Sequence, residues 1–164
     1  MKKGIAASKG YAIGTVFLQE HEEIVITDQK VTDVAAEKEA LQKSLDASRA
    51  QLEKIKEKAA AEMGEEKAAV FEAHITLLDD PEFTGAMAME IDSNSINAMK
   101  AVDNVTNMFV SIFESMEDAY MRERAADIKD VSKRIIANLA GKSADAFAIT
   151  EANTVVVAHD LTPS

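Results

Sequence analysis

The sequence predicts a mainly α-helical protein in which a small β part is made by the two ends of the chain. Aromatic residues are only 5% of the total, while Ala, Glu and Lys are abundant, and this composition favours helix. Residues 33–63 contain no Gly or Pro and place apolar residues at helical spacing. Near the end, Thr154 to Ala158 form a β-branched run typical of a buried strand. We therefore expect an antiparallel helical bundle over about residues 33–140.

The first 30 residues favour short strands and turns. Gly4, Gly10 and Gly14 punctuate small apolar residues, and residues 12–18 have the composition of a strand. The glycine spacing does not match a dinucleotide-binding fingerprint, so tight turns between short strands are the better interpretation. Residues 24–26 are expected to add a second short extended piece.

A long first helix is expected over residues 33–63, capped by Thr32 or Asp33. Its apolar positions recur close to a heptad seam. The seam comprises Leu41, Leu45, Ser48, Leu52, Ile55, Ala59 and Met63. At 1.5 Å per residue, this helix would be about 46 Å long. It needs an antiparallel partner of similar length, which we expect among the helices nearer the C-terminus.

The stretch from Gly64 to Phe83 contains a complete helix signal. Gly64 breaks the preceding helix, and an apolar stripe then alternates with acidic positions. The stripe consists of Val70, Phe71, Ile75 and Leu78. Asp80 followed by Pro81 predicts that one helix stops and the next begins, because Asp suits an N-cap and Pro suits the first helical position.

Three more helices are expected between residues 81 and 140. A short one runs from Pro81 to about residue 91, a second begins after a cap at residues 94–95, and a third spans residues 120–139. Residues 117–118 offer the break between the last two, and Gly141 suits a helix stop. The middle of the chain is therefore predicted to be a bundle of four or five helices.

Charge and composition exclude several classes of function. The net charge of −11 argues against binding to nucleic acid or anionic membrane, because both need basic patches. The absence of cysteine excludes a disulfide framework and thiol chemistry. No apolar run reaches the roughly 18 residues of a membrane span, and the basic N-terminus is not followed by the apolar region of a signal peptide. A buried strand at the very end of the chain suggests a fragment of a larger protein.

The residues by themselves predict no active site. The histidines are His21, His74 and His159, and none stands in a zinc-ligand, P-loop or nucleophile motif. His74 is interpreted as a half-buried helix residue hydrogen-bonded to a neighbour. Residues 122–127 form a dense charge cluster that is interpreted as local salt bridging along one helix. This reasoning predicts a helical binding module with an acidic face.

Four blocks of sequence resemble the N-terminal region of Enzyme I, the phosphoenolpyruvate–protein phosphotransferase of the bacterial sugar phosphotransferase system. The blocks are GIAAS with YAIG at residues 4–14, GEEKAAVFEAHITLLDDPEF at 64–83, FESMEDAYMRERAADIKDVSKRI at 113–135 and VVVAHDLTPS at 155–164. They occur in the family order and span essentially the whole chain. Lys9 departs from the pattern, since the family commonly has Pro there.

The resemblance implies two domains. Residues 31–142 would be a helical domain that docks the phosphocarrier protein HPr, inserted into a truncated α/β phosphohistidine domain made of residues 1–30 and 143–164. In the family, the histidine that accepts phosphate lies in a GGRTSH-like motif that follows DLTPS, so none of the three histidines here would be the acceptor. The C-terminal barrel, which binds phosphoenolpyruvate and magnesium and forms the homodimer, would also lie outside this sequence. No cofactor is expected in this fragment, and a cytoplasmic location is expected.

The resemblance also implies docking residues, carried over position by position. We expect a ring of carboxylates around Leu77 and Phe83 that meets the basic residues surrounding an apolar patch on HPr. Thr76 stands where some relatives have a larger apolar residue. The expected partner-binding set is Glu65, Glu66, His74, Thr76, Leu77, Asp80, Glu82, Phe83, Tyr120 and Arg124.

Two other interpretations remain open from the sequence. The chain could be a non-catalytic helical scaffold with no specific use for its acidic face. It could also be the corresponding module of a fused phosphotransferase or of one that serves dihydroxyacetone phosphorylation. A scaffold would need the apolar seams but not the blocks RERAADIKD and VAHDLTPS, which favours the Enzyme I interpretation.

Overall fold

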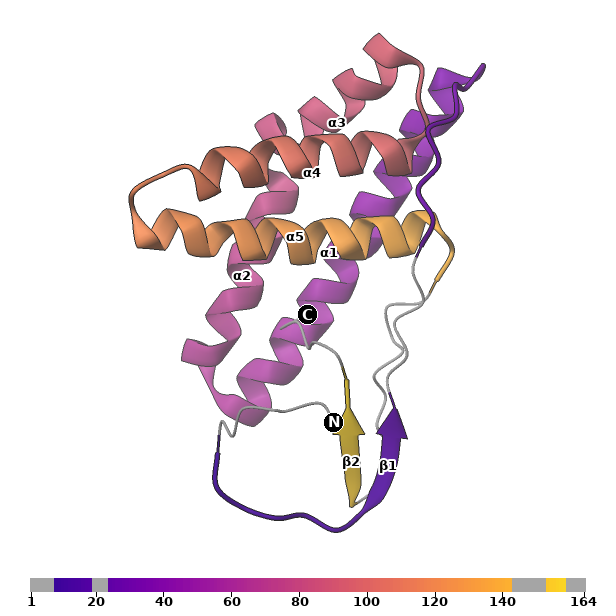
Figure 1. Cartoon of the computed structure of the whole chain (residues 1–164). Helices are drawn as coiled ribbons and strands as arrows, with labels where there is room; N and C mark the ends of the chain where they lie inside the picture. The colour runs from indigo at the N-terminus through magenta and orange to yellow at the C-terminus, as the bar shows by residue number, and fades with distance from the viewer. Residues whose placement is uncertain (1–7, 19–23, 143–152, 159–164) are drawn as a thin grey trace, which may run out of the picture. The chain divides into compact units, whose positions relative to one another are not determined.

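The computed structural model describes residues 8–18, 24–142 and 153–158, and these form two compact units. Residues 24–142 make a helical unit with helices α1 to α5, and residues 8–18 with 153–158 make a small unit that contains strands β1 and β2 (Figure 1). The predicted fold class is confirmed, because a mainly helical region is inserted between two strands. The predicted domain limits stay a prediction.

Helix α1 (Val34–Met63) is the longest element, as expected. Oδ1 of Asp33 accepts a hydrogen bond of 2.9 Å from the backbone N–H of Ala36, so Asp33 is the N-cap. Most of the predicted seam is buried, although Met63 at the end is 53% exposed. The helix stops at Gly64, whose φ of 91° lies in a region that side chains with a Cβ rarely adopt.

Helices α2 (Glu65–Asp79) and α3 (Pro81–Asn94) follow directly. The predicted stop and restart is confirmed, because Oδ1 of Asp80 accepts a 2.8 Å hydrogen bond from the backbone N–H of Glu82. The expected partner of α1 was wrong in part. The helix that packs most extensively along α1 is α2, because the turn at Gly64 returns the chain along α1 immediately.

Helices α4 (Ala98–Glu114) and α5 (Ala119–Leu139) lie side by side as a hairpin that crosses α1 and α2 (Figure 1). Asp118 caps α5, in agreement with the predicted break. The predicted cap at residues 94–95 was wrong, since α3 continues to Asn94 and Asn97 caps α4 with a 2.8 Å hydrogen bond from the N–H of Lys100. Ser95 makes the turn between these helices with a φ of 49°.

A partly buried polar network links α1 to α5 and restricts their register. Asn138 Nδ2 donates to Ser48 Oγ at 2.8 Å, and Arg134 Nη1 donates to Gln51 Oε1 at 2.9 Å. Buried polar groups are tolerated when they are paired in this way, and their directionality admits few alternative pairings. The network explains why the seam of α1 contains a buried serine.

The small unit contains a parallel pair of strands, β1 (Thr15–Leu18) and β2 (Thr154–Val157), in register from Thr15 with Thr154 onwards. The backbone N–H of Thr15 also donates to the carbonyl of Asn153 at 2.9 Å. A Cβ at Gly14 would overlap that carbonyl, so only glycine fits there. The predicted burial of β2 was wrong: Val157 is 46% exposed and the other residues of the strand are half-buried. In the described part of the chain, β1 alone pairs with β2.

Candidate docking site

The predicted carboxylates lie at two ends of α2 and do not form a ring. Glu65 and Glu66 are exposed in its first turn, whereas Asp80 and Glu82 lie at the junction with α3. The 14 residues from Glu66 to Asp80 correspond to about 21 Å along a helix. The arrangement predicted from the sequence is corrected accordingly, because a carboxylate ring would require much closer groups.

The edge of α2 that faces α1 is held by exposed ion pairs. Glu72 pairs with Lys56, and Asp79 pairs with Arg49. The hydrogen bond from Lys56 to Glu72 raises the pKa of the Lys56 ammonium above its ordinary value. Two of the acidic residues on α2 are therefore engaged within the molecule.

The opposite edge of α2 combines charge with apolar surface. Glu66, Val70, Ala73 and Leu77 are spaced by four, three and four residues, so they share one edge of the helix. Val70 and Leu77 are half-buried and pack against the core, while Glu66 is exposed. This edge offers a partner a carboxylate beside partly accessible apolar side chains.

His74 is fully buried between α2 and α5, at 0% exposure. Its Nε2 lies 3.2 Å from Oδ1 of Asp127 and its Nδ1 lies 3.6 Å from Oδ2 of Asp130. Because an ionised carboxylate only accepts hydrogen bonds, the proton that joins His74 to Asp127 is carried by Nε2. The interpretation of His74 as half-buried is corrected, and its side chain does not offer a contact surface.

Phe83 is also fully buried, at 0% exposure. Its ring makes an edge-on contact with Phe109, with ring centroids 5.3 Å apart. Its assignment as a docking residue came from the family resemblance, and a fully buried ring offers a partner no contact surface. Thr76 is exposed, and its hydroxyl donates to the carbonyl of Glu72 at 2.9 Å.

One face of α5 meets α2 at His74. Tyr120, Arg124 and Asp127 are spaced by four and three residues and so share this face. Arg124 Nη1 donates to the hydroxyl of Tyr120 at 3.4 Å, and the guanidinium carbon lies 5.9 Å from the ring centroid. Tyr120 is 63% exposed. The predicted docking residues of α2 and of α5 thus lie on two edges that are joined by the His74–Asp127 contact.

The charge cluster at residues 122–127 does not act through local salt bridges as interpreted from the sequence. Arg122 donates instead to the carbonyls of Met116 and Glu117 near the end of α4, while Asp127 contacts His74. Asp127 and Asp130 are absent from the predicted site. Their three-residue spacing, together with the need of a buried histidine for polar partners, was the available signal.

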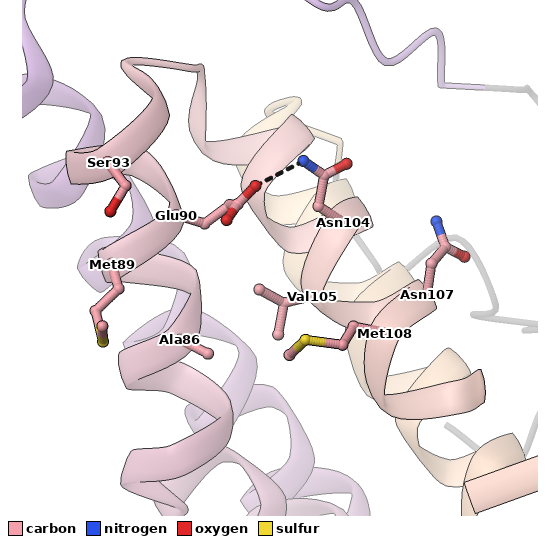
Figure 2. A pocket seen from close by; sticks show the side chains of 8 residues that line it. All are labelled: Ala86, Met89, Glu90, Ser93, Asn104, Val105, Asn107 and Met108. Carbon is pink, nitrogen blue, oxygen red and sulfur yellow. Dashed lines mark hydrogen bonds between the residues drawn. The ribbon is translucent and has the colours of Figure 1, made fainter. Parts of the chain in front are cut away.

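A second surface feature lies between α3 and α4 (Figure 2). This groove has a volume of about 480 Å³. Its polar groups are partly engaged, since Asn104 Nδ2 donates to Glu90 Oε1 at 2.9 Å. Met89 and Met108 also line it. Among the residues that line the groove, Glu90 is the only charged one, and none belongs to the docking set predicted from the sequence.

The described residues contain no group of three or more His, Asp or Glu side chains arranged to hold a metal ion. Within the same residues, no helix is both long and apolar enough to cross a membrane. His21 and His159 lie outside the residues that the structure describes. The geometry described for His74 is that of a helix–helix contact.

The chain matches the family described as "PEP-utilising enzyme, N-terminal" over residues 3–124. The chain belongs to this family. The PEP-utilising enzymes that it resembles include the phosphoenolpyruvate-protein phosphotransferase of Listeria monocytogenes, which is 46% identical over 162 residues. The corresponding protein of Lactococcus lactis is 43% identical over 165 residues. These alignments cover 99% and 100% of this chain but only 28% and 29% of the two relatives.

Solved structures agree with the family assignment. The chain resembles an NMR solution structure of Enzyme I with a TM-score of 0.87 and 43% identity, covering 99% of this chain and 66% of that one. It also resembles an N-terminal domain of "Enzyme 1 - Nitrogen" with a TM-score of 0.72 and 25% identity, covering 91% of this chain and 61% of that one. The similarity to the N-terminal region of Enzyme I is confirmed in sequence and in fold.

Proposed function

We propose that the helical unit of this PEP-utilising family member docks the phosphocarrier protein HPr, and that the docking surface spans α2 and α5. The observation that carries the proposal is the adjacency of two edges. The α2 edge presents Glu66 and Leu77, the α5 face presents Tyr120 and Arg124, and the His74–Asp127 contact joins them. We call these two edges together the α2–α5 surface.

The chemistry of this surface suits a partner with basic residues around an apolar patch. One exposed ion pair at 4 Å contributes at most about 1 kcal/mol in water, so no single carboxylate should decide binding. The net charge of −11, to which Glu66 contributes at this surface, steers a basic partner and raises the association rate. The partly exposed apolar side chains Val70 and Leu77 supply contact that slows dissociation.

Isothermal titration calorimetry of the 164-residue chain with purified HPr tests this proposal. At two salt concentrations, we expect saturable binding that weakens as salt increases, because exposed charges are screened over about 10 Å at 0.1 M salt. A control titration with HPr whose basic surface residues are neutralised should give much weaker heats. The absence of saturable binding at low salt would reject the proposal.

In the intact protein, we propose that HPr docks here and receives phosphate from a phosphohistidine. From the resemblance, we propose that the acceptor histidine, the barrel that binds phosphoenolpyruvate and magnesium, and the homodimer contact lie outside these 164 residues. Phosphoryl transfer needs a positioned nucleophile and stabilisation of the phosphoryl charge. We propose a cytoplasmic location for the same reason of family resemblance.

These 164 residues by themselves should therefore not accept phosphate. Incubation with labelled phosphoenolpyruvate and magnesium, followed by intact-mass measurement, should leave the chain unmodified. A stoichiometric acid-labile phosphate on His21, His74 or His159 would contradict this expectation. The buried position of His74 supports it, because a phosphoryl donor needs access to a ring nitrogen.

A further inference from the structure

The contact of His74 with two carboxylates has no role in docking chemistry as such, yet it lies at the centre of the α2–α5 surface. On α2, His74 is four residues after Val70 and three before Leu77, so it underlies their edge. On α5, Asp127 shares a face with Arg124 and retains 27% side-chain exposure. The two edges therefore meet at this contact.

The two ring nitrogens of His74 have different surroundings. Nε2–H donates to Asp127 at 3.2 Å, whereas Nδ1 is 3.6 Å from Asp130, which is beyond hydrogen-bond length. Nδ1 is buried and makes no hydrogen bond within the described residues. A buried nitrogen without a hydrogen bond is costly, so apolar packing alone would not favour histidine here. The retained interaction is the hydrogen bond to the carboxylate of Asp127, which depends on orientation more strongly than apolar contact does.

We propose that His74 is a positioning residue which, through its hydrogen bond to Asp127, holds the edge of α2 and the face of α5 in the register that docking requires. The expected effect on HPr binding rests on the proposed function. The effect of His74 on the register of α2 and α5 does not depend on it. His74 touches no partner atom. It acts by fixing where Leu77 and Arg124 lie relative to each other.

Distance measurements test the structural part without HPr. The chain contains no cysteine, so Thr76→Cys and Glu123→Cys introduce two unique positions for spin labels on exposed sites of α2 and α5. Pulsed electron paramagnetic resonance should give a narrow distance distribution in the parent. The distribution should broaden or shift in His74→Leu, and it should be preserved in His74→Gln, whose amide retains an N–H donor.

A double-mutant cycle tests the consequence for HPr binding. We expect His74→Leu and Asp127→Ala each to weaken binding by about tenfold, the factor that matches one lost hydrogen bond with a charged partner. The double variant should be no weaker than either single variant, because both remove the same interaction. His74→Gln should bind within about threefold of the parent.

The outcomes separate this inference from the proposed function. If the parent fails to bind HPr, docking is rejected, and the distance distributions alone decide whether His74 sets the register. Additive effects of His74→Leu and Asp127→Ala would overturn the inference, because they would mean that Asp127 contacts HPr directly. Unchanged binding and unchanged distances in a folded His74→Leu chain would also overturn it. If His74→Leu does not fold, Asp127→Ala removes the same hydrogen bond at a partly exposed position, and His74→Gln keeps an N–H donor. The binding and distance measurements on these two variants then test the inference.

Discussion

The two edges of α2 are held to their neighbours by different physics. The edge facing α1 uses the exposed pairs Lys56–Glu72 and Arg49–Asp79, whereas the edge facing α5 uses the buried His74 and its contact with Asp127. Exposed pairs tolerate many side-chain geometries and are screened by salt. The hydrogen bond from the buried His74 to a carboxylate admits few side-chain geometries. The exposed acidic residues that are conspicuous in the sequence are therefore not the ones that organise the proposed docking surface.

The largest expected effect concerns Phe83, which the sequence assigned to docking and the structure places in the core. Phe83→Ala should lower the free energy of unfolding by about 3–5 kcal/mol, the usual cost of removing a buried aromatic ring. Urea unfolding followed by circular dichroism measures it. Met89→Ala on the same helix, where the side chain is 68% exposed, is the control and should change stability by less than about 0.5 kcal/mol. Equal effects of the two substitutions would place Phe83 outside the core.

Leu77 tests the apolar part of the α2 edge that also carries Glu66. Leu77→Ala should weaken HPr binding by about tenfold, mainly through faster dissociation, since it removes apolar contact at the interface. Surface plasmon resonance separates the two rate constants. The matched control is Met108→Ala, which truncates an exposed apolar side chain in the groove between α3 and α4. Weaker binding in Met108→Ala alone would move the docking site to that groove.

Glu66 tests the charge on the same edge. Glu66→Lys should slow association by roughly threefold and leave dissociation nearly unchanged, because an exposed carboxylate acts by long-range steering. The difference from the parent should shrink as salt increases. Glu57→Lys makes the same change of charge on α1 and controls for net charge. An equal loss in both variants would mean that overall charge, and not this edge, attracts HPr.

The smallest expected effect is on the edge facing α1. Lys56→Met should leave the thermal midpoint at pH 7 nearly unchanged, since exposed ion pairs contribute little to stability. Because the partner Glu72 raises the pKa of Lys56, what the pair does contribute is present at neutral pH. It is lost as the pH rises through the raised pKa of Lys56, above the ordinary value of 10.5. A large fall in the thermal midpoint at pH 7 would show that the exposed ion pair contributes strongly to stability, which would contradict the contrast between the two edges of α2.

Most of the fold could be predicted from local signals. The caps at Asp33 and Asp80 and the stop at Gly64 each depend on a few neighbouring residues, and each was located correctly. The pairing of α1 with α2 was not predicted, because seams of similar length on several helices do not specify which of them meet. Asn97 was missed as a cap because Asn94 and Ser95 carry the same local signal.

The site was less predictable than the fold. Exposed carboxylates on α2 follow from helical spacing. Their separation of 14 residues from Glu66 to Asp80, about 21 Å along a helix, also followed from the predicted helix and already argued against a ring. The burial of His74 depends on the packing of α5 against α2, and that of Phe83 depends on the packing of α4 against α3. A single sequence does not encode these pairings locally. Asp127 and Asp130 acquire their role from a residue more than 50 positions away in the sequence.

An NMR titration of isotope-labelled chain with unlabelled HPr tests the central claim most directly. The amide signals of residues 66–77 on α2 and of residues 120–127 on α5 should shift together with one dissociation constant, while those of residues 34–55 on α1 should remain in place. His74 and its neighbours should shift although the side chain is buried, because the contact joins the two edges. Perturbation centred on α1, or on the groove between α3 and α4, would contradict the assignment of docking to the α2–α5 surface.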